Sequence, residues 1–215
     1  MKTIALFGGT GGLGSQLAPL LSKDYKVIIL GSRSIDVANY YDVEAFFYDN
    51  EIDIVINLSG YSYDSFLHKY SDLTYLEIDK QLDINIRGTI NVATCALPKM
   101  REKNYGRLIL MSSVLADHPV VSTSIYAGCK GFVDSFVKTI SLENATKNIN
   151  CNSLQLGYFD GGLTHRIPEA FKDNILKNIP AKRWGSIEEL HNTIEYLIST
   201  PYITGQSINI SGGLN

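Results

Sequence analysis

The sequence is poor in cysteine, and its cysteines are scattered. Three occur among 215 residues, Cys95, Cys129 and Cys151, with no CxxC pair and no histidine at ligand spacing. This pattern excludes a disulfide framework and a zinc site of the usual spacing. We therefore expect free thiols in a reducing compartment and no bound metal.

The sequence also lacks a long apolar run and an excess of positive charge. No stretch approaches the ~20 apolar residues of a membrane span. The apolar run at residues 4–7 ends in a glycine cluster, which makes it too short for a signal peptide. The net charge of −3 argues against nucleic acid or an anionic membrane as the main partner. These absences predict a cytoplasmic protein that acts on a small molecule.

Short apolar runs alternate with longer stretches of helical period, which is typical of βαβ units and a parallel sheet. The apolar runs lack clean polar alternation, as expected for strands covered on both faces. The predicted strands are Thr3–Phe7, Val27–Leu30, Ile54–Leu58, Arg107–Met111, Cys151–Leu156 and Ser207–Ile210. The predicted helices are Leu13–Ser22, Val37–Asn50, Leu73–Lys103, Tyr126–Thr146, a short pair in Pro168–Asn178, and Ile187–Ser199.

The connection after the second strand is unusually short. Between Leu30 and Val37 there are too few residues for the crossover helix that parallel strands normally need. We predict that the crossover between strands 2 and 3 is shortened to a loop and that Ile35–Val37 forms a vestigial third strand. The expected fold is a single α/β domain over residues 1–215, doubly wound, with a mostly parallel seven-stranded sheet and helices on both faces.

A glycine cluster directly follows the first predicted strand and opens a helix. Gly8, Gly12 and Gly14 give the spacing G-x-x-x-G-x-G, with Thr10 and Leu13 between them. The glycines permit a tight turn, close approach of the backbone to a pyrophosphate, and close packing of helix on strand. The same residues would also serve a purely structural turn. Their place at the first βα junction favours dinucleotide binding.

The end of the second strand favours one dinucleotide over the other. It reads Ser32-Arg33, with no acid before Asp36. An acid at this point would accept hydrogen bonds from the ribose of NAD(H), whereas an arginine accommodates the 2′-phosphate of NADP(H). The sequence therefore predicts NADP(H) rather than NAD(H), and the alternative is that Arg33 is a solvated loop residue.

Tyr126 and Lys130 lie four residues apart at the start of a predicted helix, and so on one face. A tyrosine hydroxyl is a poor base at neutral pH because its pKa is near 10. A neighbouring ammonium favours the phenolate, so we predict that Lys130 lowers the pKa of Tyr126. This spacing often arises by chance, and two surface residues are the alternative.

Two further polar residues give this pair a context. The fourth of the six apolar runs leads into Ser112-Ser113, and the carboxyl end of a strand is where open α/β sheets bind ligands. A serine there could hydrogen-bond a substrate oxygen. Asn85 interrupts a long predicted helix, where its side chain either caps or bends the helix or takes part in a water relay to Lys130.

Taken in order, these segments resemble the short-chain dehydrogenase/reductase family along essentially the whole chain. The family resemblance rests on the glycine loop, Asp36-Val37, Asn57-Leu58-Ser59-Gly60, Asn85, Ser112-Ser113, Tyr126 with Lys130, Asn152–Gly157, and the tail 205–213. It implies a Rossmann-type fold and a catalytic tetrad of Asn85, Ser113, Tyr126 and Lys130. The overall pattern is most similar to that of 3-oxoacyl thioester reductases.

The resemblance also implies a set of cofactor contacts. It places Asp36 and Val37 near the adenine, Asn57, Ser59 and Gly60 against the adenosine, and Tyr126 and Lys130 at the nicotinamide ribose. Gly157 and Phe159, which follow the predicted strand Cys151–Leu156, complete the expected site. The chain departs from the family pattern at Phe7, at Leu58-Ser59, at Leu156, and at Gly161, where a threonine is usual and Thr164 is a candidate substitute.

The sequence thus predicts an NADP(H)-dependent oxidoreductase that reduces a ketone or aldehyde, or oxidises the corresponding alcohol, by hydride transfer. An NADP(H)-binding sensor without turnover is the alternative. The resemblance further implies a homodimer or homotetramer, with candidate surfaces at Leu82–Met100, Tyr126–Thr146 and Ser207–Asn215.

Overall fold

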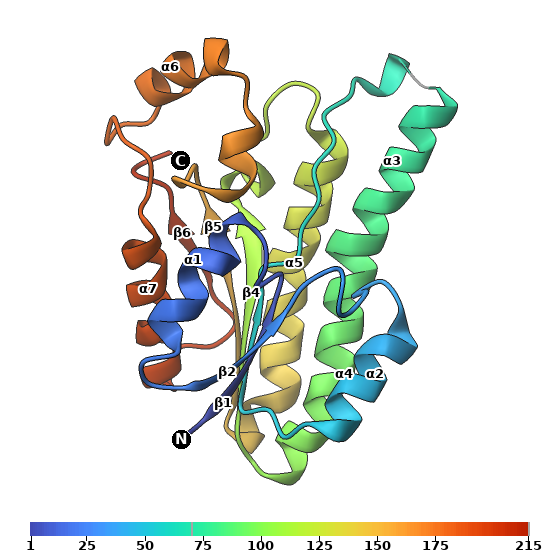
Figure 1. Cartoon of the computed structure of the whole chain (residues 1–215), viewed down its shortest axis with the longest axis vertical. Helices are drawn as coiled ribbons and strands as arrows, with labels where there is room; N and C mark the ends of the chain where they lie inside the picture. The colour runs from blue at the N-terminus through green and yellow to red at the C-terminus, as the bar shows by residue number, and fades with distance from the viewer. Residues whose placement is uncertain (70, 215) are drawn as a thin grey trace.

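A computed structural model describes residues 1–69 and 71–214, so Tyr70 and Asn215 lie outside the described part of the chain. Six parallel strands form one sheet between two layers of helices (Figure 1). The strands are β1 (Thr3–Phe7), β2 (Lys26–Leu30), β3 (Ile54–Asn57), β4 (Gly106–Ser113), β5 (Ile149–Leu156) and β6 (Ser207–Ile210). The predicted α/β fold class is confirmed, and each predicted apolar run forms a strand.

The strand order explains where a ligand would bind. It is β2-β1-β3-β4-β5-β6, so the chain runs from β1 outward to β2 and then returns across β1 to β3. Connections after β1 and after β3 therefore leave in opposite directions. In open α/β sheets such a switch point opens a crevice at the carboxyl ends of the strands, which is where ligands bind.

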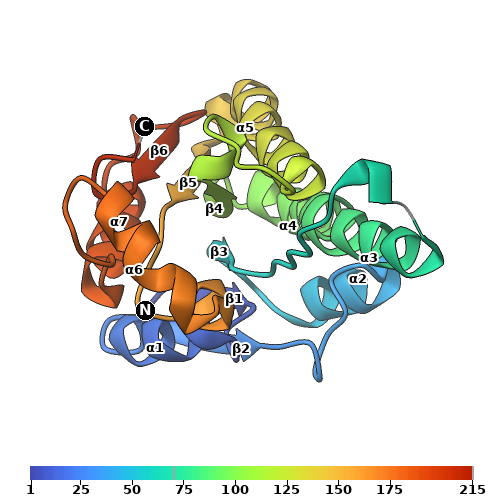
Figure 2. The same cartoon turned by 90° about the horizontal axis from the view of Figure 1, so that it is seen from above.

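Helices cover both faces of the sheet (Figure 2). The α-helices are α1 (Gly12–Leu21), α2 (Tyr40–Asp49), α3 (Asp72–Leu82), α4 (Gly88–Glu102), α5 (Ser124–Asn144), α6 (Glu169–Asn178) and α7 (Ile187–Ser199). Short 3-10 turns lie at Leu67–Lys69, Val114–Ala116, Ala145–Lys147 and Gly162–Arg166. Pro168–Asn178 thus forms one helix rather than a pair. Within the described chain, no helix combines the length and the apolar character needed to cross a bilayer.

Two apolar cores result from this layering. On one face, α2, α4 and α5 pack on side chains such as Phe7, Val55 and Leu108. On the other face, α1 and α7 pack on side chains such as Leu6 and Ile109. The side chains of neighbouring residues in a strand point into opposite cores. The strands β1, β3 and β4 therefore consist of buried residues almost throughout, as predicted from apolar runs without polar alternation.

The predicted seventh strand does not form, so the sheet has six strands rather than seven. The side chains of Ile35 and Val37 are buried, but their backbone follows turns instead of pairing with β2. Ser34 Oγ accepts from Gly31 N at 3.0 Å and donates to Gly31 O at 2.9 Å. Ile35 N also donates to Gly31 O at 3.0 Å. These local bonds turn the chain away, and the predicted loop leads directly into α2.

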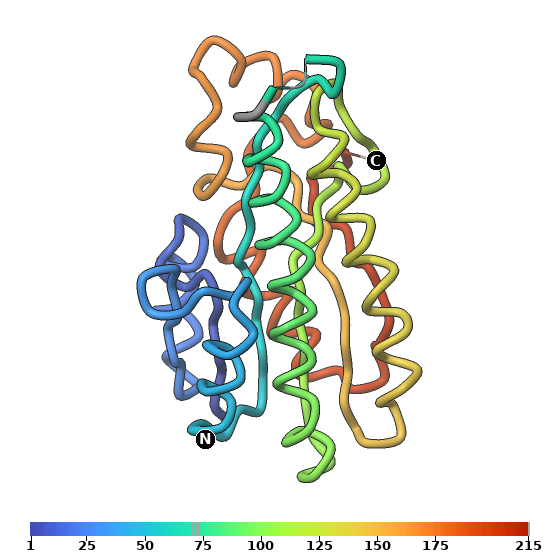
Figure 3. The backbone as a smooth tube through the Cα atoms, turned by 90° about the vertical axis from the view of Figure 1, so that its right-hand side faces the viewer, coloured from blue at the N-terminus to red at the C-terminus, as the bar shows by residue number. Residues whose placement is uncertain are grey.

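The helix predicted at Leu73–Lys103 is interrupted rather than continuous. α3 and α4 are joined by a π-turn at Asp83–Arg87, and together they form one long rod (Figure 3). A π-turn inserts one extra residue and releases main-chain groups from the regular helical bonding pattern. Such turns are frequent at functional sites, and this one contains Asn85.

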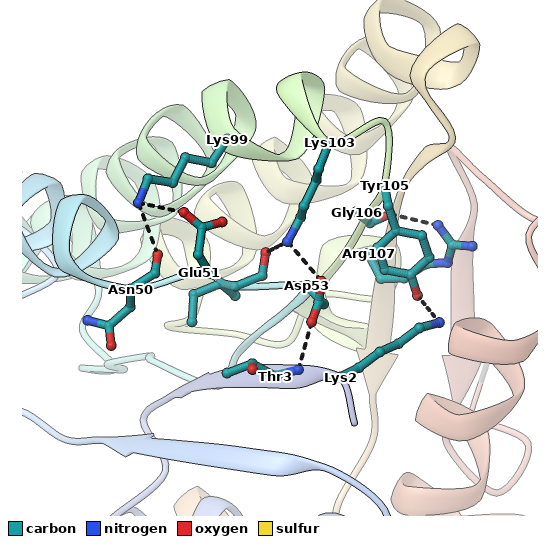
Figure 4. Close-up of polar contacts among 11 residues, drawn as sticks. Lys2, Thr3, Asn50, Glu51, Asp53, Lys99, Lys103, Tyr105, Gly106 and Arg107 are labelled. Carbon is teal, nitrogen blue, oxygen red and sulfur yellow. Dashed lines mark hydrogen bonds and ion pairs between the residues drawn. The ribbon is translucent and has the colours of Figure 1, made fainter.

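A network of charged residues links the amino-terminal ends of β1, β3 and β4 (Figure 4). Asp53 accepts from Thr3 N and from Lys103 Nζ, both at 2.8 Å. Lys2 Nζ donates to Tyr105 OH at 2.6 Å, and Arg107 lies over the same ring at 4.5 Å from its centroid. Because it lies at the amino-terminal ends of the strands, away from the ends where open α/β sheets bind ligands, we interpret this network as structural.

Candidate active site

The glycine loop is shaped by close backbone approaches. Gly8 has φ +70°, and a side-chain carbon there would lie 2.7 Å from the carbonyl carbon of Leu58. A side-chain carbon on Gly14 would lie 2.3 Å from Gly8 O. Both positions therefore require glycine, one for the turn after β1 and one for the packing of α1 on it. Gly12 begins α1 and stays exposed.

Thr10 and Leu13 contact two different segments. The Thr10 side chain packs over Gly31, where an added carbon would lie 2.0 Å from Thr10 Oγ1. Leu13 packs against the segment that follows β5, where an added carbon on Gly162 would lie 3.1 Å from Leu13 Cγ. The loop is therefore bordered by the end of β2 on one side and by the Gly161-Gly162 turn on the other.

The residues after β2, which were predicted to meet a 2′-phosphate, lie at the surface. Ser32 and Arg33 are exposed, and within the described residues Arg33 makes no hydrogen bond or ion pair. Asp36 is also exposed, but its carboxylate accepts from Ala38 N at 3.0 Å. The Val37 side chain is buried against Gly88, and its main-chain oxygen accepts from Asn91 Nδ2 at 2.9 Å.

The segment after β3 brings the predicted adenosine contacts beside the predicted catalytic residues. Asn57 is buried and its Oδ1 accepts from Ser59 N at 3.0 Å, which fixes the turn. Gly60 is exposed, and a side-chain carbon there would lie 3.5 Å from Asn85 Oδ1 and 3.7 Å from Lys130 Nζ. Asn57, Gly60, Asn85 and Lys130 thus meet at one edge of the sheet.

The side chain of Asn85 holds the backbone of Tyr61. Its Nδ2 donates to Tyr61 O at 2.7 Å and to Gln81 O at 2.9 Å, and its Oδ1 accepts from Tyr61 N at 3.3 Å. Both N–H groups of the carboxamide are therefore used. A water in a relay to Lys130 would have to contact Oδ1 or the main chain of Asn85.

The two serines at the end of β4 differ in their partners. Ser112 is buried towards α5, where its Oγ donates to Asp134 Oδ2 at 2.9 Å and lies 3.1 Å from Lys130 O. Ser113 begins the turn that follows, and its Oγ accepts from Leu115 N at 3.2 Å. This bond leaves the Ser113 O–H free to donate, whereas Ser112 is committed to the interior.

Tyr126 and Lys130 are both buried on α5, with 9% and 3% of their surface exposed. Lys130 Nζ donates to Met111 O at 2.9 Å and lies 5.3 Å from the centroid of the Tyr126 ring. Burial lowers the pKa of Lys130 to about 8, against the opposing charges of Cys129 and Asp134. The surface-residue alternative is therefore excluded for this pair.

The predicted effect of Lys130 on Tyr126 is wrong for this structure. Burial raises the pKa of Tyr126 well above its ordinary value, and the charges of Cys129 and Asp64 raise it further. Removal of water from the buried hydroxyl is the largest cause, because it disfavours the charged phenolate. Tyr126 therefore keeps its proton at neutral pH.

The residues after β5 that were predicted to contact a cofactor have different surroundings from one another. Gly157 pairs with the sheet, because its N–H donates to Ile210 O at 2.9 Å. The side chain of Phe159 is 2% exposed and packs in the α1–α7 core, so only its main chain is available to a cofactor. Thr164 is buried in the 3-10 turn Gly162–Arg166.

The sequence motifs do not include Gln81 and Asp134, two buried polar side chains next to the candidate site. Gln81 pairs with Tyr63, donating to its carbonyl and accepting from its N–H, both at 3.2 Å. Asp134 accepts hydrogen bonds from β4 and β5 directly behind Lys130. The available signal was spacing, since each lies four residues from a predicted site residue, Gln81 before Asn85 and Asp134 after Lys130.

Comparison with known proteins places the chain in a family. A sequence model described as enoyl-(acyl carrier protein) reductase matches residues 16–215. Carbonyl reductase family member 4 of Xenopus laevis is 29% identical, over 99% of this chain and 98% of its own. The 3-oxoacyl-(acyl-carrier-protein) reductase FabG of Rickettsia typhi is 28% identical, over 99% and 96%.

A solved structure supports the same fold. ElxO with NADP bound superposes with a TM-score of 0.88 at 22% identity, over 99% of this chain and 98% of that one. The family match, the full-length coverage of the relatives and the shared architecture agree with the order of motifs described above. The chain belongs to the short-chain dehydrogenase/reductase family of oxidoreductases.

Proposed function

We propose that this chain is an NADP(H)-dependent carbonyl reductase, which reduces a ketone or aldehyde or oxidises the corresponding alcohol. The observation that carries the proposal is the buried pair of Tyr126 and Lys130, where the lysine nitrogen lies 5.3 Å from the ring centroid. A buried ammonium beside a buried phenol is costly for folding alone, because neither group is solvated. The pair suits proton transfer.

The residues present fit a dinucleotide. The glycine loop leaves Gly12 exposed at the amino terminus of α1, where main-chain N–H groups favour an anion. Of the three N–H groups on Lys130 Nζ, one donates to Met111 O, so two remain for ribose hydroxyls. Arg33 and Ser32, both exposed, suit a 2′-phosphate. A bound nicotinamide would supply or accept the hydride.

Tyr126 is the proposed proton donor in the reductive direction. Because burial keeps it protonated at neutral pH, the phenol can give its proton to the carbonyl oxygen. The Lys130 ammonium then stabilises the phenolate that forms, at a site from which water is excluded. In the oxidative direction, the phenolate would accept the proton of the alcohol.

Ser113 and Asn85 complete the proposed tetrad. The O–H of Ser113 can donate to the substrate oxygen, since its Oγ already accepts from Leu115 N. Asn85 positions Tyr61 and Gly60 beside Lys130, and its free Oδ1 lone pair can hold a water for proton resupply. The substrate carbonyl would then lie between Ser113 and Tyr126.

The relatives suggest two substrate classes. FabG proteins are named for 3-oxoacyl thioesters, and carbonyl reductase family member 4 is named for carbonyl compounds. We propose a 3-oxoacyl thioester or another small ketone as substrate. We also propose a homodimer or homotetramer, because α4 and α5 present exposed apolar side chains, including Ile90 and Leu142; light scattering of the purified protein measures its mass.

A carbonyl screen tests the proposal. Purified protein is assayed for NADPH oxidation with 3-oxoacyl thioesters, ketones and aldehydes, beside K130A and a matched control, K138A, which removes an exposed lysine of the same helix. We expect turnover by the wild type and K138A, and a loss of about 100-fold or more in K130A. Cofactor binding without turnover of any compound would favour the sensor and contradict the proposal.

A further inference from the structure

A buried carboxylate lies directly behind the proposed catalytic pair. Asp134 follows Lys130 by one helical turn on α5 and is 8% exposed. Its oxygens accept from Ser112 Oγ at 2.9 Å, from Ser153 Oγ at 2.6 Å and from Gln155 Nε2 at 2.8 Å. A set of three donors suits an ionised carboxylate, which only accepts hydrogen bonds.

The carboxylate and the lysine are joined through β4. Ser112, which donates to Asp134, also lies 3.1 Å from the main-chain oxygen of Lys130. The neighbouring Met111 carbonyl accepts from Lys130 Nζ at 2.9 Å. Two consecutive residues of one strand therefore connect the anion and the cation, and the next residue along that strand is Ser113.

Within the described chain, the groups that face Lys130 leave Asp134 as its anionic partner. On α5 these groups are Tyr126, which keeps its proton, the buried thiol Cys129, and Asp134. From the other elements come the Met111 carbonyl of β4, Gly60 and Asn85, which are neutral, while the charge of Asp64 acts on Tyr126 and not on Lys130. A buried ammonium is stable as a cation only when a negative charge or several acceptors compensate it.

We propose that Asp134 is a positioning residue of the active site, an inference that rests on the proposed function. Its carboxylate keeps Lys130 in the ammonium form and, through Ser112, fixes the end of β4 that carries Ser113. The Gln155 amide extends this arrangement, because it donates to Asp134 at 2.8 Å and to Asp117 at 2.7 Å, just beyond the turn after Ser113. Asp134 itself has no role in contacting substrate or cofactor.

The proposal has a measurable electrostatic consequence. The Asp134 charge favours the ammonium form of Lys130 and so raises its pKa, and at a protein interior's effective dielectric constant of about 20 such an interaction shifts a pKa by about one unit or more. Loss of the Asp134 charge should therefore lower the pKa of Lys130 by about one unit or more, from its value of about 8. A neutral carboxyl group at this position would have no such effect.

The test measures the titration of Lys130 by NMR of lysine-labelled protein, with K130R to assign the signal. D134N and D134S remove the charge, D134E retains it, and S153A removes one hydrogen bond to the carboxylate but leaves its charge. We expect the Lys130 midpoint to fall by about one pH unit or more in D134N and D134S, to return towards the wild-type value in D134E, and to stay unchanged in S153A.

Three outcomes would overturn the proposal. One is an unchanged Lys130 midpoint in both neutral variants. Another is an equal shift in S153A, which would assign the effect to packing. The third is failure of both neutral variants to fold while D134E folds, which would make the carboxylate purely structural. Because the titration needs no substrate, a shifted midpoint together with no turnover on any carbonyl compound would contradict the proposed function alone.

Discussion

The carboxamide of Asn85 pairs with both main-chain groups of Tyr61, donating to its oxygen at 2.7 Å and accepting from its N–H at 3.3 Å. Gln81, one turn earlier, pairs in the same way with Tyr63. Four residues of a helix rise about 6 Å, close to the length of two residues of extended chain. The helix therefore offers two side-chain amides at the spacing of an extended segment and holds residues 61–63 beside the candidate active site.

Gln81→Leu should destabilise the protein by about 1–2 kcal/mol, because it leaves the N–H and C=O of Tyr63 without their partner at a partly buried site. Urea unfolding measures the loss. The control is Q206A, at an exposed glutamine, and should cost less than about 0.5 kcal/mol. Equal losses in the two variants would show that the pairing with Tyr63 contributes nothing.

Arg33→Ala should weaken NADPH binding by about 10-fold to 100-fold and leave NADH binding unchanged, because a charged hydrogen bond to the 2′-phosphate is worth about 1.5–3 kcal/mol. Titration of nucleotide fluorescence measures both affinities. K23A removes an exposed positive charge elsewhere and should change neither. Equal weakening of NADPH and NADH by R33A would contradict the assignment of the 2′-phosphate to this arginine.

Turnover in the reductive direction should fall as the pH rises through about 8, because Lys130 then loses the proton that stabilises the phenolate. Tyr126, whose pKa is raised by burial, should keep its proton throughout this range. The measurement is kcat against pH on an active compound with saturating NADPH. A rate that stays constant to pH 10 would exclude the lysine ammonium from the reaction.

Asp53 should stabilise the fold in a pH-dependent way. Burial alone would raise the pKa of this carboxyl, but the hydrogen bonds from Lys103 and Thr3 N and the charges of Lys103 and Lys2 outweigh it and lower the pKa. A lowered pKa in the folded state contributes stability above the unfolded value of about 3.9, and this contribution is lost as the pH falls through the folded value.

D53N should therefore cost about 1–2 kcal/mol at pH 7, and the difference from the wild type should shrink below about pH 4. Thermal unfolding at several pH values measures this, and NADPH oxidation should be unchanged because the residue lies at the opposite edge of the sheet. A difference that is constant with pH would show that the loss comes from packing and not from the charge.

The order of motifs along the chain predicted the fold class, the glycine loop and the meeting of Asn85 with Lys130, because these depend on spacing and on strand ends. The prediction of a seventh strand was wrong because hydrogen bonds of the Ser34 side chain turn the backbone, although the residues that follow include Ile35 and Val37. An apolar pattern reports burial of side chains, and Ile35 and Val37 are indeed buried, but it does not report main-chain pairing.

Other features depend on contacts that are distant in the sequence. Gln81 with Tyr63, and Asp134 with Ser153, are polar pairs from different elements, and neither lies in a motif. The direction of the pKa shift of Tyr126 was wrong because it is set by burial, which the spacing of Tyr126 and Lys130 does not contain. The burial of the Phe159 side chain in the core under α1 and α7 was likewise not contained in the sequence pattern, and the expected contact of Phe159 with a cofactor stays a prediction for its main chain.

The most direct test of the proposed mechanism is the rate of NADPH oxidation by Tyr126→Phe on a compound that the wild type reduces. The substitution keeps the buried ring and removes only the hydroxyl. We expect a loss in kcat of about 100-fold or more, with NADPH affinity and thermal stability close to those of the wild type. A variant that reduces the compound at the wild-type rate would contradict the assignment of Tyr126 as proton donor.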